Sequence, residues 1–469
     1  MTIETSGGTS RNTSTLIDIN SFGPRRARVT IKHWQLRDLI CKTALPNEIL
    51  YVSDRFVKSM DIKTGKSVKC AEFPFEPRCI ATSSRGSGNG DSIIATGGIQ
   101  RGQFGISYRP EQQQDGYSTM NPVTAVELGG SINNSITLFN QGSASVSALV
   151  CNNDHSLRML DISPTGHSVV DKICLPVPLN HASMSPDGNT IITCGDSPQL
   201  FVFHPEERSN SLSNRRSWTR SITLPTSSDS GFSTAFSPSG VLFAVAAQDG
   251  VASIFDSRFV SSSSTACKPL KMIESTRPRT NAGAFRCLKF TPGAEDLLLI
   301  TEQSGRVHVV DARKFEDRQV LDIPNTNDLL PPRSSNHLAG GTVSNHMRHV
   351  RLNQGSWADD QAGFDNGSDD DVEEDNDGDD DEGNMIHDDY YYEHSTAAGR
   401  GSSTNRFLAS IVDPHHRLSG SRPMQEKEVS GIAWSEEDGG MVVVGWNNGI
   451  GTWNVDNWGR RVFPAYNMR

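Results

Sequence analysis

Residues 232–256 read FSTAFSPSGVLFAVAAQDGVASIFD, which is three short apolar runs separated by two turns. The first turn is Ser-Pro-Ser-Gly at 237–240, and the second is Gln-Asp-Gly at 248–250. Short runs of β-branched and aromatic residues with Gly or Pro at every break are typical of antiparallel strands joined by tight turns. The stretch therefore predicts three strands of one small sheet.

The same order of runs and turns recurs along the chain, and the Ser-Pro-like turns at Pro186, Pro238 and Pro292 are 52 and 54 residues apart. Seven units share this order, some of them weakly: residues 49–68, 78–108, 131–162, 182–203, 232–256, 285–311 and 431–454. A repeat of three or four short strands cannot bury both faces alone, so neighbouring repeats must stack. We therefore expect an all-β ring of seven blades, which also removes most exposed sheet edges.

Ring closure needs a strand from one end of the chain to complete the blade that the other end supplies. The last unit stops after its third strand, and residues 30–41 precede the first full unit. We expect residues 30–41 to complete the last blade. The predicted organisation is a disordered N-terminal tail at 1–29, the closing strand and blades one to six at 30–329, an insertion at 330–422, and the last blade with a C-terminal tail at 423–469.

Across residues 30–325 and 428–457, the chain resembles the WD40-repeat family. The resemblance rests on the Ser-Pro-Asp-Gly turn at 185–188, the Asp-Gly turn at 249–250 and strands that end in two apolar residues and Asp. It implies a seven-bladed WD40-type β-propeller. The chain departs from the family because no repeat ends in Trp-Asp, which puts the family's usual His-to-Asp hydrogen bond in question.

Two further segments, residues 33–39 (HWQLRDL) and 296–313, resemble a fungal group of WD-repeat proteins with a short C-terminal domain of unknown function. Some members of that group are substrate receptors of the GID ubiquitin ligase. The resemblance implies a non-enzymatic scaffold that binds a client protein and a larger assembly.

The acidic residues are concentrated in one part of the chain. The net charge is −11, yet residues 359–393 alone hold 17 Asp and Glu and no Lys or Arg, so the remainder is mildly basic. Like charges at this density repel and cannot form a core, so we expect a disordered insertion between blades six and seven. It is either a solvated spacer or a binder of a basic partner such as a histone tail, which leaves a chromatin or histone-handling factor as the alternative function. Ser368 precedes three Asp and is a candidate phosphorylation site.

Composition and motifs argue against several function classes. The eight cysteines form no CxxC pair, so neither a disulfide framework nor a metal site is expected. No catalytic or cofactor-binding motif is present, so we predict neither an enzyme nor a cofactor. Residues 1–21 lack the apolar core of a signal peptide, and no apolar run is long enough to span a membrane. We therefore expect a cytoplasmic or nuclear protein, without a membrane or nucleic-acid partner.

Two predicted third strands end in an apolar pair followed by Asp-x-Arg, at residues 254–258 and 309–313. This pattern resembles the box by which WD40 receptors dock to the adaptor of cullin-4 ubiquitin ligases. The alternative is local: Asp at a strand end stabilises the next turn, and an Arg two residues on pairs with it. The candidate partner-docking residues are Asp256, Arg258, Asp311 and Arg313.

Arg78 and Arg286 each stand at the start of a predicted first strand, where propeller side chains approach the rim of the central channel. Guanidinium groups bind carboxylates bidentately, so this pair is a candidate ligand contact for an acidic or carboxyl-bearing partner. The alternative is solvent-exposed rim charge.

Overall fold

The computed structural model describes residues 15–84, 92–109, 120–141, 145–163, 166–205, 217–260, 267–292, 296–324 and 427–456. Within these residues the chain forms 28 strands and three 3₁₀ turns of three residues each, which confirms the all-β prediction. None of the helical turns in this part of the chain is long and apolar enough to cross a membrane.

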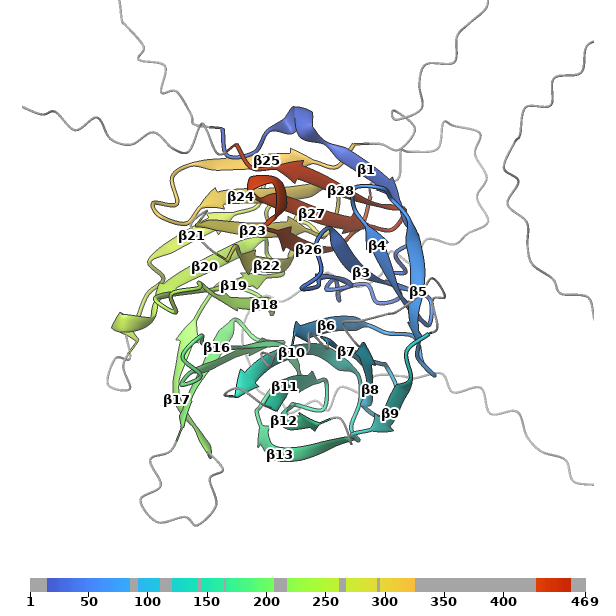
Figure 1. Cartoon of the computed structure of the whole chain (residues 1–469). Coiled ribbons are helices and arrows are strands. Elements are labelled where there is room, and N and C mark those ends of the chain that lie inside the picture. The colour runs from blue at the N-terminus through green and yellow to red at the C-terminus, as the bar shows by residue number, and fades with distance from the viewer. Residues whose placement is uncertain are drawn as a thin grey trace, which may run out of the picture. The chain divides into compact units, whose positions relative to one another are not determined.

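The strands form seven four-stranded antiparallel sheets, and each sheet is one blade of a propeller (Figure 1). From the centre outward, blades one to four contain β2 (Ile40–Lys42), β3 (Glu48–Ser53), β4 (Phe56–Asp61) and β5 (Ser67–Glu72); β6 (Cys79–Ser84), β7 (Ser92–Gly97), β8 (Gln103–Arg109) and β9 (Val123–Glu127); β10 (Asn133–Gln141), β11 (Ser145–Asn152), β12 (Ser156–Ser163) and β13 (Gly166–Cys174); β14 (Leu179–Met184), β15 (Ile191–Gly195), β16 (Gln199–Pro205) and β17 (Trp218–Pro225). Blades five to seven contain β18 (Gly231–Phe236), β19 (Leu242–Ala247), β20 (Val251–Asp256) and β21 (Lys271–Glu274); β22 (Phe285–Phe290), β23 (Leu297–Glu302), β24 (Arg306–Asp311) and β25 (Arg318–Asp322); β26 (Val429–Ser435), β27 (Met441–Trp446), β28 (Gly449–Asn454) and β1 (Gly23–Arg26).

The innermost strands of the seven blades contact one another in sequence around the ring, and β26 of blade seven contacts β2 of blade one. Because every blade repeats the same antiparallel order, all innermost strands run the same way along the central channel. We call the opening of the channel at which these strands begin the start mouth. We call the opposite opening, at which they finish, the end mouth. The third strands run in the same direction, so they also finish on the face of the end mouth.

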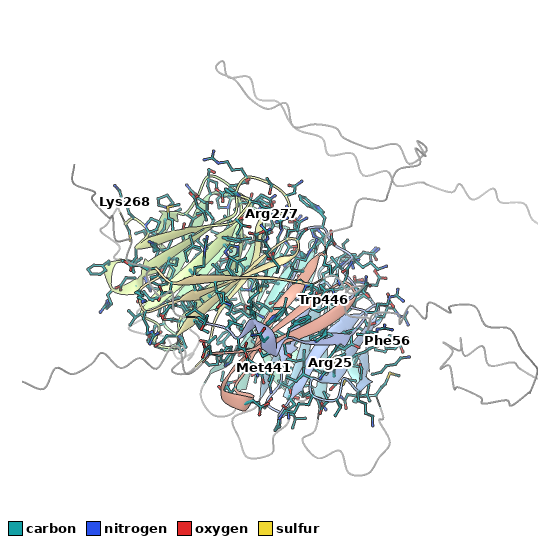
Figure 2. The ribbon with its side chains drawn as sticks, turned by 90° about the horizontal axis from the view of Figure 1, so that it is seen from above. Arg25, Phe56, Lys268, Arg277, Met441 and Trp446 are labelled. Atoms are coloured by element: carbon teal, nitrogen blue, oxygen red, sulfur yellow. The ribbon has the colours of Figure 1, made fainter. Side chains whose placement is uncertain are left out.

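The core lies between adjacent blades. In blade five, the Phe243 and Phe255 rings stack with centroids 5.2 Å apart and pack against Ile192 and Val202 of blade four. Trp446 of blade seven is fully buried and is labelled in Figure 2. Each blade thus buries its faces against its neighbours, as a repeat too thin to fold alone requires.

The repeated Ser-Pro turn joins the first and second strands of a blade. In blade five, the Ser237 backbone N–H donates to the Leu242 carbonyl at 2.8 Å, and the Gly240 N–H donates to the Ser237 carbonyl at 2.9 Å. Gly240 has a φ of 71°, which a glycine adopts without steric cost. These bonds explain why Ser, Pro and Gly mark the repeat.

The strand that closes the ring lies closer to the N-terminus than predicted. β1, not residues 30–41, completes blade seven, and it pairs antiparallel with β28 from Gly23–Thr452 to Arg26–Gly449 (Figure 1). Residues 30–39 instead cross toward the channel and lead into β2. The sequence Gly-Pro-Arg-Arg of β1 has no apolar alternation, and Pro is tolerated there because the strand is an edge.

Residues 15–29 are part of the ring and not of a tail, which corrects the boundary expected at residue 29. Leu16 and Ile17 are only 1% exposed, and their backbone N–H groups donate to the Gln319 carboxamide oxygen of blade six. Arg25 donates to the Ile62 carbonyl at 3.0 Å and so connects β1 to blade one (Figure 2). The N-terminal segment therefore joins blade seven to both of its neighbours.

A buried carboxylate connects three segments of blade six. The Glu302 side chain, fully buried at the end of β23, accepts hydrogen bonds from His308 Nε2 at 2.9 Å, from the backbone and hydroxyl of Thr276, and from Arg277 Nη2 at 2.9 Å. Burial alone would raise the pKa of Glu302, but these hydrogen bonds outweigh it and lower the pKa to about 2. The anion thus holds the loop that enters blade six against the β23–β24 turn.

Residues 325–426 follow blade six and precede blade seven, as the insertion prediction requires, and they lie outside the described residues. The predicted disorder of residues 330–422, the acidic stretch at 359–393 and Ser368 all fall there. Residues 1–14 and 457–469 also lie outside the described residues.

Candidate functional site

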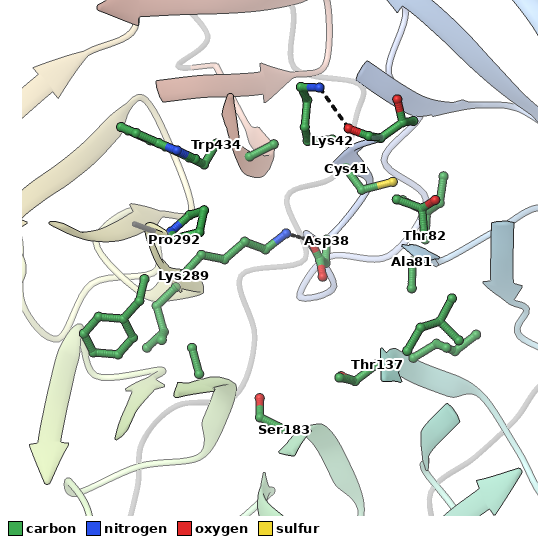
Figure 3. A pocket seen from close by; sticks show the side chains of 18 of the residues that line it. Asp38, Cys41, Lys42, Ala81, Thr82, Thr137, Ser183, Lys289, Pro292 and Trp434 are labelled. Carbon is green, nitrogen blue, oxygen red and sulfur yellow. Dashed lines mark hydrogen bonds and ion pairs between the residues drawn. The ribbon is translucent and has the colours of Figure 1, made fainter. Parts of the chain in front are cut away.

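The central channel holds a pocket of about 640 Å³ to which all seven innermost strands, or the turns that follow them, contribute side chains. Its apolar wall includes Leu138, Phe236, Phe290 and Trp434, from blades three, five, six and seven. Figure 3 shows Trp434, Thr82, Thr137 and Ser183 distributed around it. The pocket lies toward the end mouth, because its lining comes mostly from the later residues of these strands.

An ion pair spans the inner part of the pocket. Lys289 of β22 extends toward Asp38, and Lys289 Nζ lies 2.9 Å from Asp38 Oδ1 (Figure 3). The Lys289 side chain is 34% exposed, and this surface faces the channel. Burial opposes the ammonium charge, but attraction to Asp38 outweighs it and raises the pKa of Lys289. The pocket therefore presents a fixed pair of opposite charges to anything that enters it.

His181 of β14 adds a neutral polar group to the pocket. Its Nδ1 accepts a hydrogen bond from the Thr234 backbone N–H at 3.2 Å and lies 2.9 Å from the Thr234 hydroxyl. Burial lowers the pKa of His181 to about 4, which Asp38 only partly opposes. The ring is thus neutral near pH 7 and carries its proton on Nε2, where it is a hydrogen-bond donor.

The rim of the pocket at the end mouth is polar. Lys42 Nζ donates to the Thr43 carbonyl at 2.8 Å and lies 3.5 Å from Glu437 Oε1. Glu437 in turn accepts from the Asn47 backbone N–H at 2.6 Å. These contacts tie blade seven to blade one, so the rim is held in place.

The pocket has the features of a binding site. Burial raises the pKa of Cys41 and Cys287 to about 12, so neither thiol supplies a thiolate at neutral pH. The described residues contain no cluster of three or more His, Cys, Asp or Glu side chains placed to hold a metal ion. An apolar wall with a few convergent polar groups is the usual composition of a ligand site.

Three arginines lie at the start mouth, and we call them the arginine cluster: Arg37, which donates to the His33 carbonyl; Arg286, whose guanidinium lies by the Trp34 ring; and Arg78, which precedes β6. They are 2%, 7% and 3% exposed, so Arg78 and Arg286 are not solvent-exposed rim charges. Arg37 was not predicted, and it comes from the segment that crosses to β2. His33 of the same segment lies among them: burial and then the charges of the three arginines lower its pKa to about 4.

The Asp-x-Arg residues form local ion pairs on the face of the end mouth. Arg258 Nε donates to Asp256 Oδ1 at 2.9 Å, and Arg313 Nε donates to Asp311 Oδ1 at 3.0 Å. In both pairs the Arg Nη2 lies 2.5 Å from the second carboxylate oxygen. The Asp side chains are buried, whereas those of Arg258 and Arg313 are 67% and 48% exposed. The geometry matches the local alternative, and docking stays a prediction.

The sequence did not single out Asp38, Lys289, His181 or Arg37. A signal existed for Lys289, because it is a charged residue between Leu288 and Phe290 on an innermost strand. Asp38 and Arg37 lie in residues 30–41, which the sequence pattern predicts as the closing strand. The irregular path of that segment into the channel depends on long-range contacts, such as the Leu39 N–H to the Ser430 carbonyl at 2.9 Å.

Comparison with protein families gives a match within blade six. Residues 283–322 match the uncharacterised protein domain DUF2415. These residues coincide with blade six, from β22 to β25, so the matched domain is one blade of the ring. Blade six supplies Lys289 to the pocket and Arg286 to the arginine cluster.

Two curated fungal proteins are similar to the chain. The uncharacterised protein C4G3.03 of Schizosaccharomyces pombe is 32% identical, over 66% of this chain and 81% of that protein. The uncharacterised protein YLR149C of Saccharomyces cerevisiae is 29% identical, over 64% of this chain. The match spans 54% of the length of YLR149C, about half of that protein.

Proposed function

The chain belongs to the same family as C4G3.03 of Schizosaccharomyces pombe, and on that premise we propose that it is a non-enzymatic scaffold that binds proteins. The observation that carries this proposal is the channel pocket, to which all seven blades contribute. A rigid ring holds these side chains in place, so a bound segment meets a preorganised surface and little ordering cost is added on binding. Loops on such a ring suit capture of a peptide or a domain.

Within this role we propose that the protein is the substrate receptor of a ubiquitin ligase, of the GID or the cullin-4 type. The resemblance of residues 33–39 and 296–313 to fungal WD-repeat proteins supports the GID type. The cullin-4 type draws support from the two Asp-x-Arg pairs, which lie on adjacent blades with exposed guanidinium groups. In this arrangement the pocket holds the client, and the turns around it contact the ligase.

Affinity capture of the full chain followed by mass spectrometry tests the ligase role. We expect recovery of GID or cullin-4 components together with a client. The double variant Arg258→Ala/Arg313→Ala should lose the cullin-4 adaptor if the Asp-x-Arg pairs dock, and should keep GID components. Arg28→Ala is the control, because Arg28 is also an exposed arginine paired with one carboxylate. Recovery of neither ligase would contradict the receptor role and leave the scaffold role intact.

A further inference from the structure

We infer that the arginine cluster at the start mouth is a second binding site, which takes an oxyanion group of an acidic peptide. This site lies at the other end of the channel from the pocket and does not rest on the ligase proposal. The class of ligand follows from three features of the cluster: its buried nitrogens without acceptors, the carboxylates near it, and the residues that lie beside it.

The cluster holds buried donors without acceptors. Nε and Nη2 of Arg37 and Nε and Nη1 of Arg78 are buried and make no hydrogen bond within the described residues. A buried polar group without a partner costs about 1–3 kcal/mol, and more when it is charged. Three of these nitrogens have no acceptor within the described residues, and Arg37 Nη2 has only a 3.5 Å contact with Glu428, so a carboxylate or phosphate would supply the missing acceptors.

Three carboxylates lie near the charges of the cluster: Glu428, Glu76 and Asp229. Glu428 lies 3.5 Å from Arg37 and Glu76 lies 3.3 Å from Arg78, each through a single contact. Both carboxylates lie near the surface, with side chains 44% and 37% exposed. The nitrogens of Arg286 donate to two neutral amides, and its attraction to Asp229 is smaller than the effects of burial and of Arg37. An incoming anion therefore adds charge compensation and can take over the contacts of the two surface carboxylates.

Arg286 is held in a fixed orientation. Its Nε donates to Gln303 Oε1 at 3.0 Å and its Nη1 donates to Gln248 Oε1 at 2.7 Å. The guanidinium also lies over the Phe232 ring, 4.4 Å from the centroid. Burial and then repulsion by Arg37 lower the pKa of Arg286 to about 9, so it is still a cation at neutral pH. Its positive charge is thus fixed in space before any ligand arrives.

His33 and Trp34 lie beside the cluster. His33 Nδ1 accepts from the backbone N–H groups of Gln35 and Leu36, both at 3.3 Å, so the neutral ring carries its proton on Nε2 and is a further donor. Trp34 is 60% exposed and lies over Arg286, with 5.9 Å between the guanidinium and the ring centroid. The indole of Trp34 is the exposed apolar surface that an arriving peptide meets first, next to the guanidinium of Arg286.

A peptide fits these observations better than a nucleic acid. The donors converge on one small region, which holds one or two oxyanions, whereas polynucleotides are bound through a longer series of phosphate contacts. The exposed indole next to the cluster suits a peptide with an apolar residue beside its acidic group.

Fluorescence anisotropy of a labelled hexaglutamate peptide with the full chain tests this inference, with hexaglutamine as the neutral control. We expect hexaglutamate alone to bind, and Arg78→Gln and Arg286→Gln to weaken its affinity at least tenfold. Arg101→Gln is the matched control, because Arg101 is 79% exposed in the β7–β8 turn on the same face. Equal loss in Arg101→Gln, or full binding in both cluster variants, would overturn the inference.

Further measurements separate the oxyanion sources. The first is the binding of a peptide that has one phosphoserine in place of the glutamates. The second is competition by inorganic phosphate against hexaglutamate. Together they show whether the bound group is a phosphate or a carboxylate. A single-stranded oligonucleotide that binds more tightly than either peptide would overturn the peptide assignment.

Thermal unfolding controls for misfolded variants. Hexaglutamate should raise the melting temperature of the wild type and leave that of Arg78→Gln unchanged. If the arginine variants lose their cooperative transition, Trp34→Ala decides, because this exposed side chain can be removed without a cavity. Binding weakened several-fold in Trp34→Ala supports the site, and unchanged binding overturns it. Failure of this site would leave client capture by the pocket unaffected, so the two proposals fail separately.

Discussion

At the scale of single residues, Glu302 shows how a divergent repeat keeps its blade together. Its carboxylate bonds to His308 and Arg277, and loss of one partner from a buried ion pair costs about 3–5 kcal/mol. Glu302→Ala should therefore lower the free energy of unfolding by about that amount in urea titrations. Glu72→Ala removes a carboxylate from a surface pair with Arg55 and should change it by less than about 1 kcal/mol. Similar losses in both variants would contradict the role of Glu302.

His181 makes stability depend on pH in a defined direction. Its folded pKa of about 4 lies below its ordinary value of 6.5, so the unfolded chain binds the proton first as pH falls. The free energy of unfolding therefore does not depend on His181 above pH 6.5, and it falls as the pH is lowered from 6.5 toward 4, because only the unfolded chain binds the proton in this range. Melting temperatures from pH 7 to 4 should fall less steeply for His181→Gln than for the wild type. His155→Asn, at an exposed turn, should keep the wild-type slope, and equal slopes in all three would refute the assignment.

The residues of the site show why sequence alone found only part of it. Arg78 and Arg286 were identified because both stand at the start of recognisable strands, but their burial and their third partner, Arg37, were not foreseen. Arg37 and Asp38 lie in a segment without strand periodicity, and contacts with several blades hold it. Asp38 illustrates this, because its carbonyl accepts from Ile80 of blade two while its carboxylate binds Lys289 of blade six.

At the scale of elements, the sequence predicted the inner strands well and the outer ones poorly. Third strands such as β20 and β24 are buried along their length, and burial on both faces produces the continuous apolar runs that were recognised. Outer strands such as β13 and β21 are half-exposed, so their sequences carry no such pattern. The closing strand β1 has the weakest sequence pattern of the outer strands. Core packing does not constrain its edge position, so Pro and Arg are accepted there.

Loss of the N-terminal segment should open the ring. A chain that begins at residue 27 lacks β1 and the buried side chains of Leu16 and Ile17, each worth about 1.5–3 kcal/mol. It also exposes the β28 edge to pairing with other chains. We expect a lower melting temperature and aggregation visible in light scattering. A chain that begins at residue 15 should behave as the full chain does, and equal behaviour of both truncations would contradict closure by this segment.

At the scale of the whole molecule, the pocket and the ligase contacts are expected to be separable. Ala235→Trp places an indole in the pocket from β18 and should abolish client recovery while the ligase components remain. Ala125→Trp, on the outer strand β9, is the control and should retain the client. Both variants should be checked for a wild-type melting transition. Client recovery that survives Ala235→Trp would place the client elsewhere on the ring.

Deletion of residues 359–393 distinguishes the receptor from the alternative of a chromatin or histone-handling factor. If the pocket holds the client, capture should persist after the deletion. If the acidic stretch holds a basic client, capture should disappear, and in the full chain it should weaken as salt rises from 0.05 to about 0.5 M because exposed charges are screened.

Blade seven combines β1 with β28, which lie far apart in the sequence, so the nascent chain on the ribosome cannot complete this blade until β28 has been made. About 430 residues separate β1 from β28, and at about 5–20 residues per second translation between them takes about 20–90 s. Throughout that interval β1 has no partner strand, and the half-made ring offers open edges at both ends. We therefore expect the ring to close only after β28 has been synthesised, and the open edges to be exposed to pairing with other chains until then.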